Sequence, residues 1–497
     1  MQAAFPDVNL ALAAPEVGLA ILICAILIAD LFVSLENKAL VGVLSLAGVV
    51  VLALVSLSQW GGGPRSGFSG FYVADNFSVF VKVLVFACTA FSILLSLQYA
   101  KVEKINYGEY YAMMLFSLFG MVVMVSGSDL LTIYLGLETM SISVYVLVAF
   151  IRHDPLSREA GLKYFLMGAF ASGILLYGIA LTYGFTGTTG LKGIAQAFGG
   201  NALAADPAMT FALILLVAGF GFKLALVPFH MWLPDAYTGA PTAITAFMSV
   251  AVKGATVAAL IRIFFTAFPA MAPKWNLLLW VLAAATMIWG NVAAIAQTNL
   301  KRLLAYSSIA HAGYILMGVV AGLGAAGGKP VFSPEGVSAV AFYLVAYLFT
   351  NLGAFGMLIL ICREGYRGDA IEDWRGVGQA HPWAGLAFVV FLLSLAGIPP
   401  TAGFVGKLFL FAAAIQNEYY WLAVIGILTS AVSVYYYGRI MMIMFMEDRR
   451  ASQPAVEFSK APSLFLALVL LLFFTLLLGV FPGGFIEAAK GSVQGLL

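Results

Sequence analysis

The sequence contains little charge and few cysteines, and each shortage excludes a class of protein. Only 10% of its 497 residues are charged and 62% are hydrophobic, whereas soluble domains use about 25% charged residues. Cys24, Cys88 and Cys362 lie far apart without a CxxC pair, which argues against a disulfide framework and against an iron–sulfur or zinc site. The net charge of +2 gives no indication of nucleic-acid binding. The composition instead predicts a polytopic membrane protein.

The first apolar run has no Lys or Arg before it, which a secretory signal would need, so we expect it to be the first membrane span. Apolar stretches that can each cross ~30 Å of hydrocarbon predict an all-α polytopic fold of about fourteen transmembrane helices. These stretches begin near Pro15, Ala39, Asn76, Tyr111, Asp129, Ala160, Met209, Pro241, Asn276, Lys301, Gly336, Ala384, Tyr419 and Ser463.

Basic residues gather in alternate connections, which predicts the orientation in the membrane. The odd-numbered connections hold Lys38, Lys101, Lys104, Arg152, Arg158, Lys301, Arg302, Arg363, Arg367, Arg375, Arg449, Arg450 and Lys460. The even-numbered connections and the tails hold Arg65, Lys192, Lys274, Lys329 and Lys490. The odd-numbered connections, which hold most of the basic residues, are expected to face the cytoplasm. Both termini are therefore expected on the non-cytoplasmic side. The longest connections, near 187–208 and 363–383, have room for a short surface helix at most.

Two predicted spans, the seventh and the twelfth, are interrupted by proline. Pro228 follows Lys223, and "LAGIPPTAGFVGK" places Pro399 and Pro400 before Lys407. Proline cannot donate a backbone hydrogen bond, so the carbonyls of Leu224, Leu395 and Ala396 lose helical partners. Because the breaks are five helices apart, the second unit would be inverted relative to the first. The predicted division is 1–110 (three N-terminal helices), 111–270 (helices 4–8), 271–450 (helices 9–13) and 451–497 (helix 14).

Four charged residues are predicted to lie deep in the membrane: Glu138, Lys223, Lys253 and Lys407. At about 1.5 Å per residue, Glu138 lies roughly 14 Å into its helix. A lipid-facing charge there costs at least ~2.5 kcal/mol. The alternatives are a structural Glu–Lys pair or lysines that reach the interface. The depth of the lysines argues against the second, and a single structural pair would not need three lysines.

Several other polar residues have weaker positional signals. Lys163 and Lys301 lie near the cytoplasmic starts of their helices, where anchoring and function explain them equally well. Lys82, Arg262 and Arg439 are expected at the membrane interface. Ser307, His311 and Tyr314 share one helix face, and His230 lies beside the first break; a structural role remains an alternative for both histidines.

The chemistry that these residue types permit is proton handling. Burial disfavours the charged form of a lysine, and a nearby carboxylate favours it. A change in the distance between Glu138 and Lys223 would therefore load or release a proton. The segment "GLGAAGG" (322–328) has the spelling of a dinucleotide motif, but it follows a membrane helix without a strand before it. Two histidines within predicted spans are poor support for a haem.

Three segments carry a resemblance to a known family. "GFGFKLALVPFHMWLPDAYTGAPTAITAFMSVAVKGA", "GLETMSISVYVL" and "NLKRLLAYSSIAHAGYILMG" are similar to the antiporter-like subunits of respiratory complex I, which are related to multisubunit cation/proton antiporters. By that resemblance, Glu138 and Lys223 form the charge pair of the first half channel, Lys253 is the central lysine, and Lys407 is the terminal lysine. Lys163, His230, Lys301 and His311 are supporting members of a hydrophilic axis.

Among these subunits the chain looks most like subunit N of NADH:quinone oxidoreductase. A lysine at 407 replaces the glutamate of a second subunit type, and the chain stops soon after the last span, without the long lateral helix of a third. The resemblance implies proton translocation driven by electron transfer from NADH to quinone elsewhere in the complex. It implies no cofactor in this chain, with flavin, iron–sulfur clusters and quinone in partner subunits. The implied partners are other membrane-arm subunits, lipids and protons, with no nucleic acid, in a bacterial inner membrane. A cation/proton antiporter subunit and a membrane scaffold are the alternatives.

Overall fold

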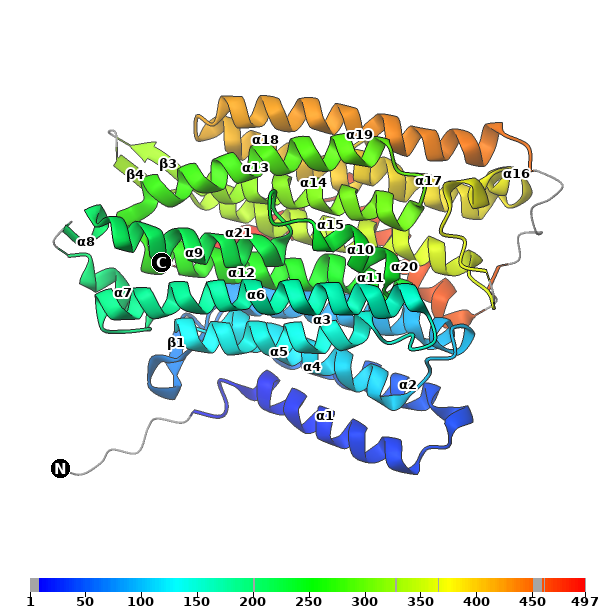
Figure 1. The fold of residues 1–497 in the computed structure, drawn as a ribbon, viewed down its shortest axis with the longest axis horizontal. Coiled ribbons are helices and arrows are strands. Elements are labelled where there is room, and N and C mark those ends of the chain that lie inside the picture. Colours follow the sequence, from blue (N-terminus) through cyan, green and yellow to red (C-terminus); the bar gives the residue numbers. More distant parts are fainter. Residues whose placement is uncertain are drawn as a thin grey trace.

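A computed structural model describes residues 9–199, 202–326, 329–364, 366–449, 458–459 and 461–496. Of the residues named above, Gly327, Gly328, Arg450 and Lys460 lie outside these ranges. The described chain forms a bundle of roughly parallel helices (Figure 1). Thirteen of the described helices are long and apolar enough to cross a membrane. One further span, the twelfth along the chain, consists of two shorter helices, which gives the predicted number of fourteen.

The spans follow the predicted order, and their starts lie within a few residues of those expected. The unbroken spans are α1 (Ala14–Phe32), α2 (Ala39–Leu57), α3 (Asn76–Val102), α4 (Gly108–Ser126), α5 (Leu130–Val148), α6 (Pro155–Thr186), α13 (Ala272–Ile295), α14 (Leu300–Val320), α15 (Pro334–Ile361), α19 (Tyr420–Met446) and α20 (Pro462–Val480). The eighth span is continuous but contains a π-helical turn, η3 (Met248–Val252), between α11 (Thr242–Phe247) and α12 (Lys253–Ala267).

Aspartates begin several of these helices. Asp75, Asp129, Asp154 and Asp206 each accept a hydrogen bond from a backbone amide of the first helical turn, which satisfies a donor that would otherwise lack an intrahelical partner. Pro155 and Pro207 occupy the first helical position, where proline loses no helical bond. Short polar signals at the membrane boundaries therefore fix where α3, α5, α6 and α9 begin.

Each of the two longest connections was expected to hold a short surface helix at most, but its described residues contain two short helices. The two longest connections hold α7 (Leu191–Ala197), α8 (Ala202–Ala205), η5 (Ile371–Trp374) and α16 (Val377–Ala380). Two antiparallel hairpins were not anticipated: β1 (Arg65–Gly67) with β2 (Tyr72–Ala74), and β3 (Leu323–Ala326) with β4 (Lys329–Phe332). Further short 3₁₀ turns are η1 (Leu35–Asn37), η2 (Phe68–Gly70) and η4 (Pro269–Met271). Both hairpins lie at one end of the bundle and α16 lies at the other (Figure 1).

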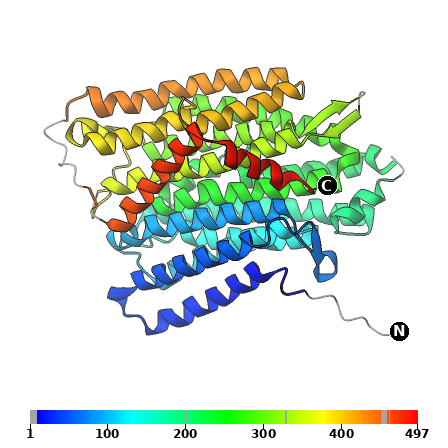
Figure 2. The same ribbon diagram turned by 180° about the vertical axis from the view of Figure 1, so that it is seen from behind.

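The middle of the bundle is the most enclosed part. The spans α11–α12, α14 and α15 are almost entirely buried, whereas only about a third of the residues of α1 and α2 are buried. From the opposite side, α20 crosses the bundle obliquely and is followed by α21 (Gly483–Val493), which was not predicted (Figure 2). The deep charges predicted on helices 7, 8 and 12 therefore belong to the interior of the protein or to its immediate border.

The seventh span is broken between α9 (Pro207–Leu224) and α10 (Trp232–Gly239). Ala225 adopts the left-handed conformation, with φ 56°. The next amide, Leu226 N, donates to Gly221 O at 2.8 Å, and the Val227–Pro228 peptide is cis. The backbone thus stops the helix at the predicted place and turns the chain away.

The twelfth span, made of α17 (Pro382–Ala396) and α18 (Ala402–Gln416), breaks in the same way. Gly397 is left-handed, with φ 85°, Ile398 N donates to Leu393 O at 2.9 Å, and the Pro399–Pro400 peptide is cis. Each feature recurs at the same sequence offset from the first break. This correspondence supports the inverted repeat, while the residue limits of the four predicted segments stay a prediction.

Candidate functional site

Lys223 lies in the last turn of α9, two residues before the left-handed Ala225, and is buried. Its Nζ donates to Ser141 Oγ at 2.7 Å and to the Tyr145 hydroxyl at 2.9 Å. The same ammonium lies 5.2 Å from the centroid of the Tyr145 ring, within the range of a cation–π contact. Two hydroxyls and an aromatic ring of α5 therefore hold this lysine.

Glu138 lies on the same helix, one turn before Ser141, but it does not form a direct ion pair with Lys223. Its Oε1 accepts a hydrogen bond of 2.5 Å from Ser172 Oγ on α6, and Ser172 Oγ is 3.1 Å from the Tyr134 hydroxyl. Ser141, one turn after Glu138 on the same helix face, donates to Leu137 O and accepts from Lys223 Nζ. Glu138 therefore lies on the helix whose hydroxyls hold Lys223, but the pairing of the two stays a prediction.

Lys253 begins α12, directly after the π-helical turn, and is also buried. Its Nζ donates to Ser308 O at 2.5 Å and to Ser308 Oγ at 2.6 Å, on α14. π-Helical turns are rare and often occur at functional sites. Here the turn immediately precedes the central lysine.

The predicted polar face of α14 is present and contacts three other helices. His311 Nδ1 is 2.5 Å from the Tyr343 hydroxyl on α15. The Tyr314 hydroxyl accepts from Asn291 Nδ2 on α13 at 3.1 Å, and Ser307 Oγ is hydrogen-bonded to the Tyr437 hydroxyl on α19. The three residues that share this face thus connect α14 with polar side chains around it.

Lys407 is held mainly by the backbone of the second break. Its Nζ donates to Leu395 O and to Ala396 O, each at 2.9 Å, and to Ser430 Oγ at 2.8 Å. These are the two carbonyls that the prolines were predicted to release. The ammonium also lies 5.0 Å from the centroid of the Tyr314 ring, so Lys407 adjoins the polar face of α14.

The four supporting residues occupy different environments. Lys301 is buried and donates to Ala240 O at 2.7 Å. The side chain of Lys163 is 47% exposed and pairs with Glu159 at 2.7 Å and with Asp235 at 3.0 Å. His230 lies 6.1 Å from the Trp289 ring, between ring centroids, and shows no hydrogen bond to any predicted site residue. Of these four residues, only His311 belongs to the hydrogen-bonded polar face that α14 forms with Ser307 and Tyr314.

Lys82 and Arg262 correct the expectation of interfacial roles. Lys82 is fully buried and pairs with Glu16 of α1 at 2.7 Å. Arg262 makes two hydrogen bonds, of 2.8 and 2.9 Å, to the carboxylate of Asp75. Burial raises the pKa of Asp75, but the Arg262 guanidinium and the Ser78 amide lower it by more, so the pKa lies below its ordinary value. These pairs connect α1, α3 and α12 and explain both charges as structural.

Sequence reasoning missed the hydroxyl partners of the lysines, namely Ser141, Tyr145, Ser308 and Ser430, and the tyrosines Tyr343 and Tyr347 of α15. A signal existed for the two tyrosines, since they stand four residues apart and share a face of a largely apolar helix. For the four partners on other helices no spacing in the sequence indicates which lysine they meet.

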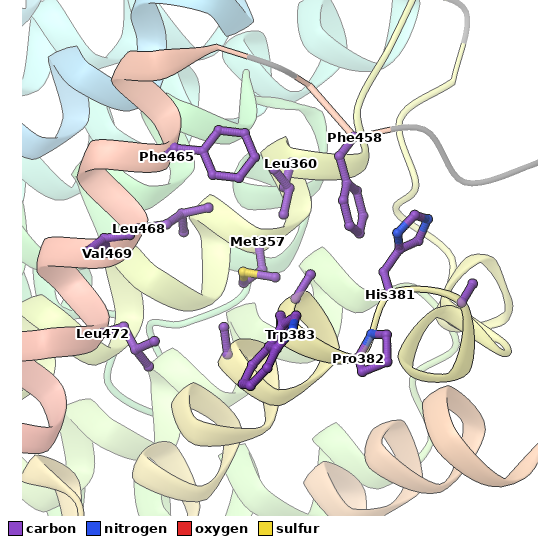
Figure 3. Close-up of a pocket in the computed structure, with 13 residues that line it drawn as sticks. Met357, Leu360, His381, Pro382, Trp383, Phe458, Phe465, Leu468, Val469 and Leu472 are labelled. Carbon is purple, nitrogen blue, oxygen red and sulfur yellow. The ribbon is translucent and has the colours of Figure 1, made fainter.

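Two surface hollows differ in character from this buried network. A groove of about 510 Å³ between α15, α17 and α20 is lined by apolar side chains, with His381, Pro382 and Trp383 at one edge (Figure 3). None of the predicted site residues lines it. A smaller cleft, of about 100 Å³, is lined by Lys163, Glu159, Asp235 and Arg302. Only the second hollow brings a predicted residue to the surface. Within the described ranges, no group of His, Cys, Asp or Glu is arranged to hold a metal ion.

Comparison with known proteins gives a consistent result. Residues 127–433 match the family model described as NADH:quinone oxidoreductase/Mrp antiporter, TM. A relative from Trichlorobacter lovleyi, NADH-quinone oxidoreductase subunit N, is 43% identical over 490 residues, which are 99% of this chain and 98% of the relative.

Solved structures agree with this match. A chain of respiratory complex I from Thermus thermophilus is 33% identical, with a TM-score of 0.78, over 95% of this chain and 98% of that chain. A chain of the Mrp complex from Dietzia sp. has a TM-score of 0.79 over 98% of this chain and 96% of that one, but only 22% identity, and so shares the fold. The chain therefore belongs to the NADH:quinone oxidoreductase/Mrp antiporter family of membrane subunits and is grouped, by sequence, with subunit N of NADH-quinone oxidoreductase.

Proposed function

We propose that this chain carries protons across a bacterial inner membrane as a subunit of an NADH:quinone oxidoreductase, with both termini on the non-cytoplasmic side. The observation that carries the proposal is the set of three buried lysines, Lys223, Lys253 and Lys407, each bonded to hydroxyl or carbonyl oxygens. A buried ammonium without a directly contacting carboxylate is costly, so a purely structural role would not favour three of them.

The proposed mechanism begins at the first break. Lys223 is bonded to Ser141 and Tyr145 of α5, the helix that carries Glu138, so a movement of α5 against α9 changes the field at the ammonium. When the carboxylate moves away, burial disfavours the charged lysine and a proton leaves. The proton then passes towards Lys253, the His311 face and Lys407. Electron transfer in partner subunits, which hold the flavin, the iron–sulfur clusters and the quinone site, drives these movements.

Lys163 and Lys301 are proposed to support proton entry. The cleft that Lys163 lines also contains Asp235 and Arg302. Lys301, next to Arg302 in the chain, is buried and donates to Ala240 O. His230 is proposed as a relay beside the first break. The other membrane-arm subunits, including further antiporter-like ones, and membrane lipids are the proposed neighbours of the exposed apolar faces.

A cation/proton antiporter subunit is the alternative function, because the family and the fold include Mrp chains. Identity favours the oxidoreductase, since the relatives named subunit N reach 43% and the Mrp chain 22%. Purification of the tagged chain from its native membrane distinguishes the two. Copurification of NADH-oxidising subunits supports the oxidoreductase. If these subunits are absent and other antiporter subunits copurify instead, the oxidoreductase is contradicted.

The test of proton transfer uses Lys223→Met and Lys407→Met in the assembled enzyme in inverted vesicles. We expect each variant to lower NADH-driven proton uptake strongly while the assembled enzyme is still present. Lys490→Met is the matched control, because Lys490 is exposed on α21. Proton uptake at the control level in both variants would contradict the proposal. A scaffold role predicts instead that the double variant Glu138→Gln/Lys223→Met shows normal NADH-driven proton uptake in the assembled enzyme.

A further inference from the structure

Two tyrosines of α15 lie between the central lysine and the terminal lysine. Tyr343 and Tyr347 are buried, stand one helical turn apart and have nearly parallel rings, with centroids 6.3 Å apart and planes at 9°. The His311 ring lies against both, at 6.1 Å from Tyr343 and 5.0 Å from Tyr347. The three rings therefore form one aromatic group in the centre of the bundle.

The Tyr347 hydroxyl belongs to the Lys253 side of this group. It donates to Ser308 Oγ at 3.0 Å, and the same oxygen accepts from Lys253 Nζ at 2.6 Å. One serine hydroxyl thus separates the ammonium from the tyrosine, and both distances are those of ordinary hydrogen bonds.

Tyr343 belongs to the Lys407 side. Its hydroxyl is 2.5 Å from His311 Nδ1, and its ring packs on the backbone next to Lys407. A Cβ atom at Gly406 would lie 2.7 Å from Tyr343 Cδ2, so the glycine at 406 provides the space that the ring occupies. Lys407 itself lies over Tyr314, whose ring is 5.8 Å from that of His311.

Ring packing alone does not account for these side chains, because phenylalanine would fill the same space. The helix uses phenylalanine at Phe342 and Phe349, close by in the sequence. A buried hydroxyl is costly unless it is hydrogen-bonded, and here both hydroxyls are bonded to polar residues of the proposed path. The hydroxyl groups, rather than the rings, are what distinguishes positions 343 and 347.

We propose that Tyr343 and Tyr347, with Ser308 and His311, form the bridge by which a proton passes between Lys253 and Lys407. The inference rests on the proposed function. Lys253 gives its proton to Ser308 Oγ as the Ser308 hydrogen passes to the Tyr347 oxygen and the Tyr347 hydrogen moves on towards His311. Each hydroxyl gains one proton and loses one, so the bridge is chemically unchanged.

The geometry identifies the two rearrangements that this transfer needs. Lys253 and Tyr347 both donate to Ser308 Oγ, so the two hydroxyls rotate until Ser308 donates to Tyr347. The step from Tyr347 to the His311–Tyr343 pair crosses the aromatic group, and it needs a rotation of the imidazole or a water between the two. Tyr343 holds the imidazole at Nδ1 and so restricts how the ring can rotate.

The experiment compares Tyr343→Phe, Tyr347→Phe and the double variant with Lys253→Met, all in the complete enzyme in inverted vesicles. The loss of NADH-driven proton uptake in Lys253→Met sets the scale. We expect the double variant to lose at least half as much, and each single variant to show a larger H₂O/D₂O rate ratio than the parent. Tyr110→Phe is the matched control, because Tyr110 is a buried tyrosine of α4 whose hydroxyl is bonded to Ser96 Oγ at 2.9 Å.

The outcomes separate the bridge from the proposed function. If Lys253→Met loses proton uptake and the double tyrosine variant pumps like the Tyr110→Phe control, the bridge is wrong and the proposed function stands. If Lys253→Met also pumps normally, both are wrong. Should the double variant assemble poorly, Ser308→Ala and Tyr347→Phe remove the same contact singly, and unchanged uptake and isotope ratio in both would overturn the bridge.

Discussion

The two broken helices have the same backbone but hold their lysines differently. In each, a left-handed residue, a hydrogen bond to the carbonyl five residues back and a cis proline follow in the same order. In the first break the lysine precedes the left-handed residue and is bonded to hydroxyls of α5. In the second the lysine follows the prolines and is bonded to the carbonyls that they release.

This difference indicates that the surroundings of the two lysines respond differently when the helices move. Backbone carbonyls at a helix end are fixed by the fold, so the surroundings of Lys407 change only if the break itself moves. The hydroxyls around Lys223 belong to another helix, the one that carries Glu138, so movement between helices changes them. The surroundings of Lys223 are therefore expected to change when α5 moves against α9, and those of Lys407 to stay constant unless the break moves.

The largest expected effect comes from removing the hydroxyls that hold Lys223. In Ser141→Ala/Tyr145→Phe the ammonium loses both side-chain bonds, each worth about 1.5–3 kcal/mol for a charged group. We expect proton uptake in vesicles to fall about tenfold or more, since about 1.4 kcal/mol corresponds to a factor of ten. Ser430→Ala removes one bond of Lys407 and leaves two carbonyls, so its loss should be clearly smaller. Equal losses would remove the distinction between the two breaks.

The left-handed residues at the two breaks should respond to exchange of Gly and Ala with stability changes of different size. Gly397→Ala places a Cβ 2.7 Å from Lys407 Cδ at a residue with φ 85°, and a non-glycine residue there costs about 1 kcal/mol or more. Ala225→Gly relieves the same strain at φ 56° at the cost of a more flexible unfolded chain, so its effect should be within about 1 kcal/mol of zero. Thermal inactivation of the purified enzyme measures both. A stability loss in Ala225→Gly as large as that in Gly397→Ala would contradict the strain argument.

The sequence was sufficient to locate the breaks but not to identify the partners of the lysines. Proline reports directly on the backbone, so the freed carbonyls of Leu395 and Ala396 were predicted, and Lys407 binds both. Ser141 and Tyr145 are distant in the chain, and which lysine they meet depends on how α5 packs on α9. Lys82 was expected at the membrane interface, but α1 and the β1–β2 hairpin cover it, since Glu16 and Tyr72 both contact its ammonium. Short-range rules thus succeed for backbone features and fail where helix packing decides.

The smallest expected effect concerns Asp235, which occupies in the first break the position that Lys407 occupies in the second. It pairs with Lys163 at 3.0 Å and Arg302 at 2.8 Å, and all three side chains are at least one third exposed. Exposed ion pairs contribute about 0–1 kcal/mol, so Asp235→Asn should lower stability by no more than that. Proton uptake should fall far less than in Lys407→Met, and Glu159→Gln, which removes another carboxylate from Lys163, is the matched control. A loss in Asp235→Asn equal to that in Lys407→Met, with the control unchanged, would mean that the two positions are equivalent in function and that the breaks differ only in the sign of the charge they carry.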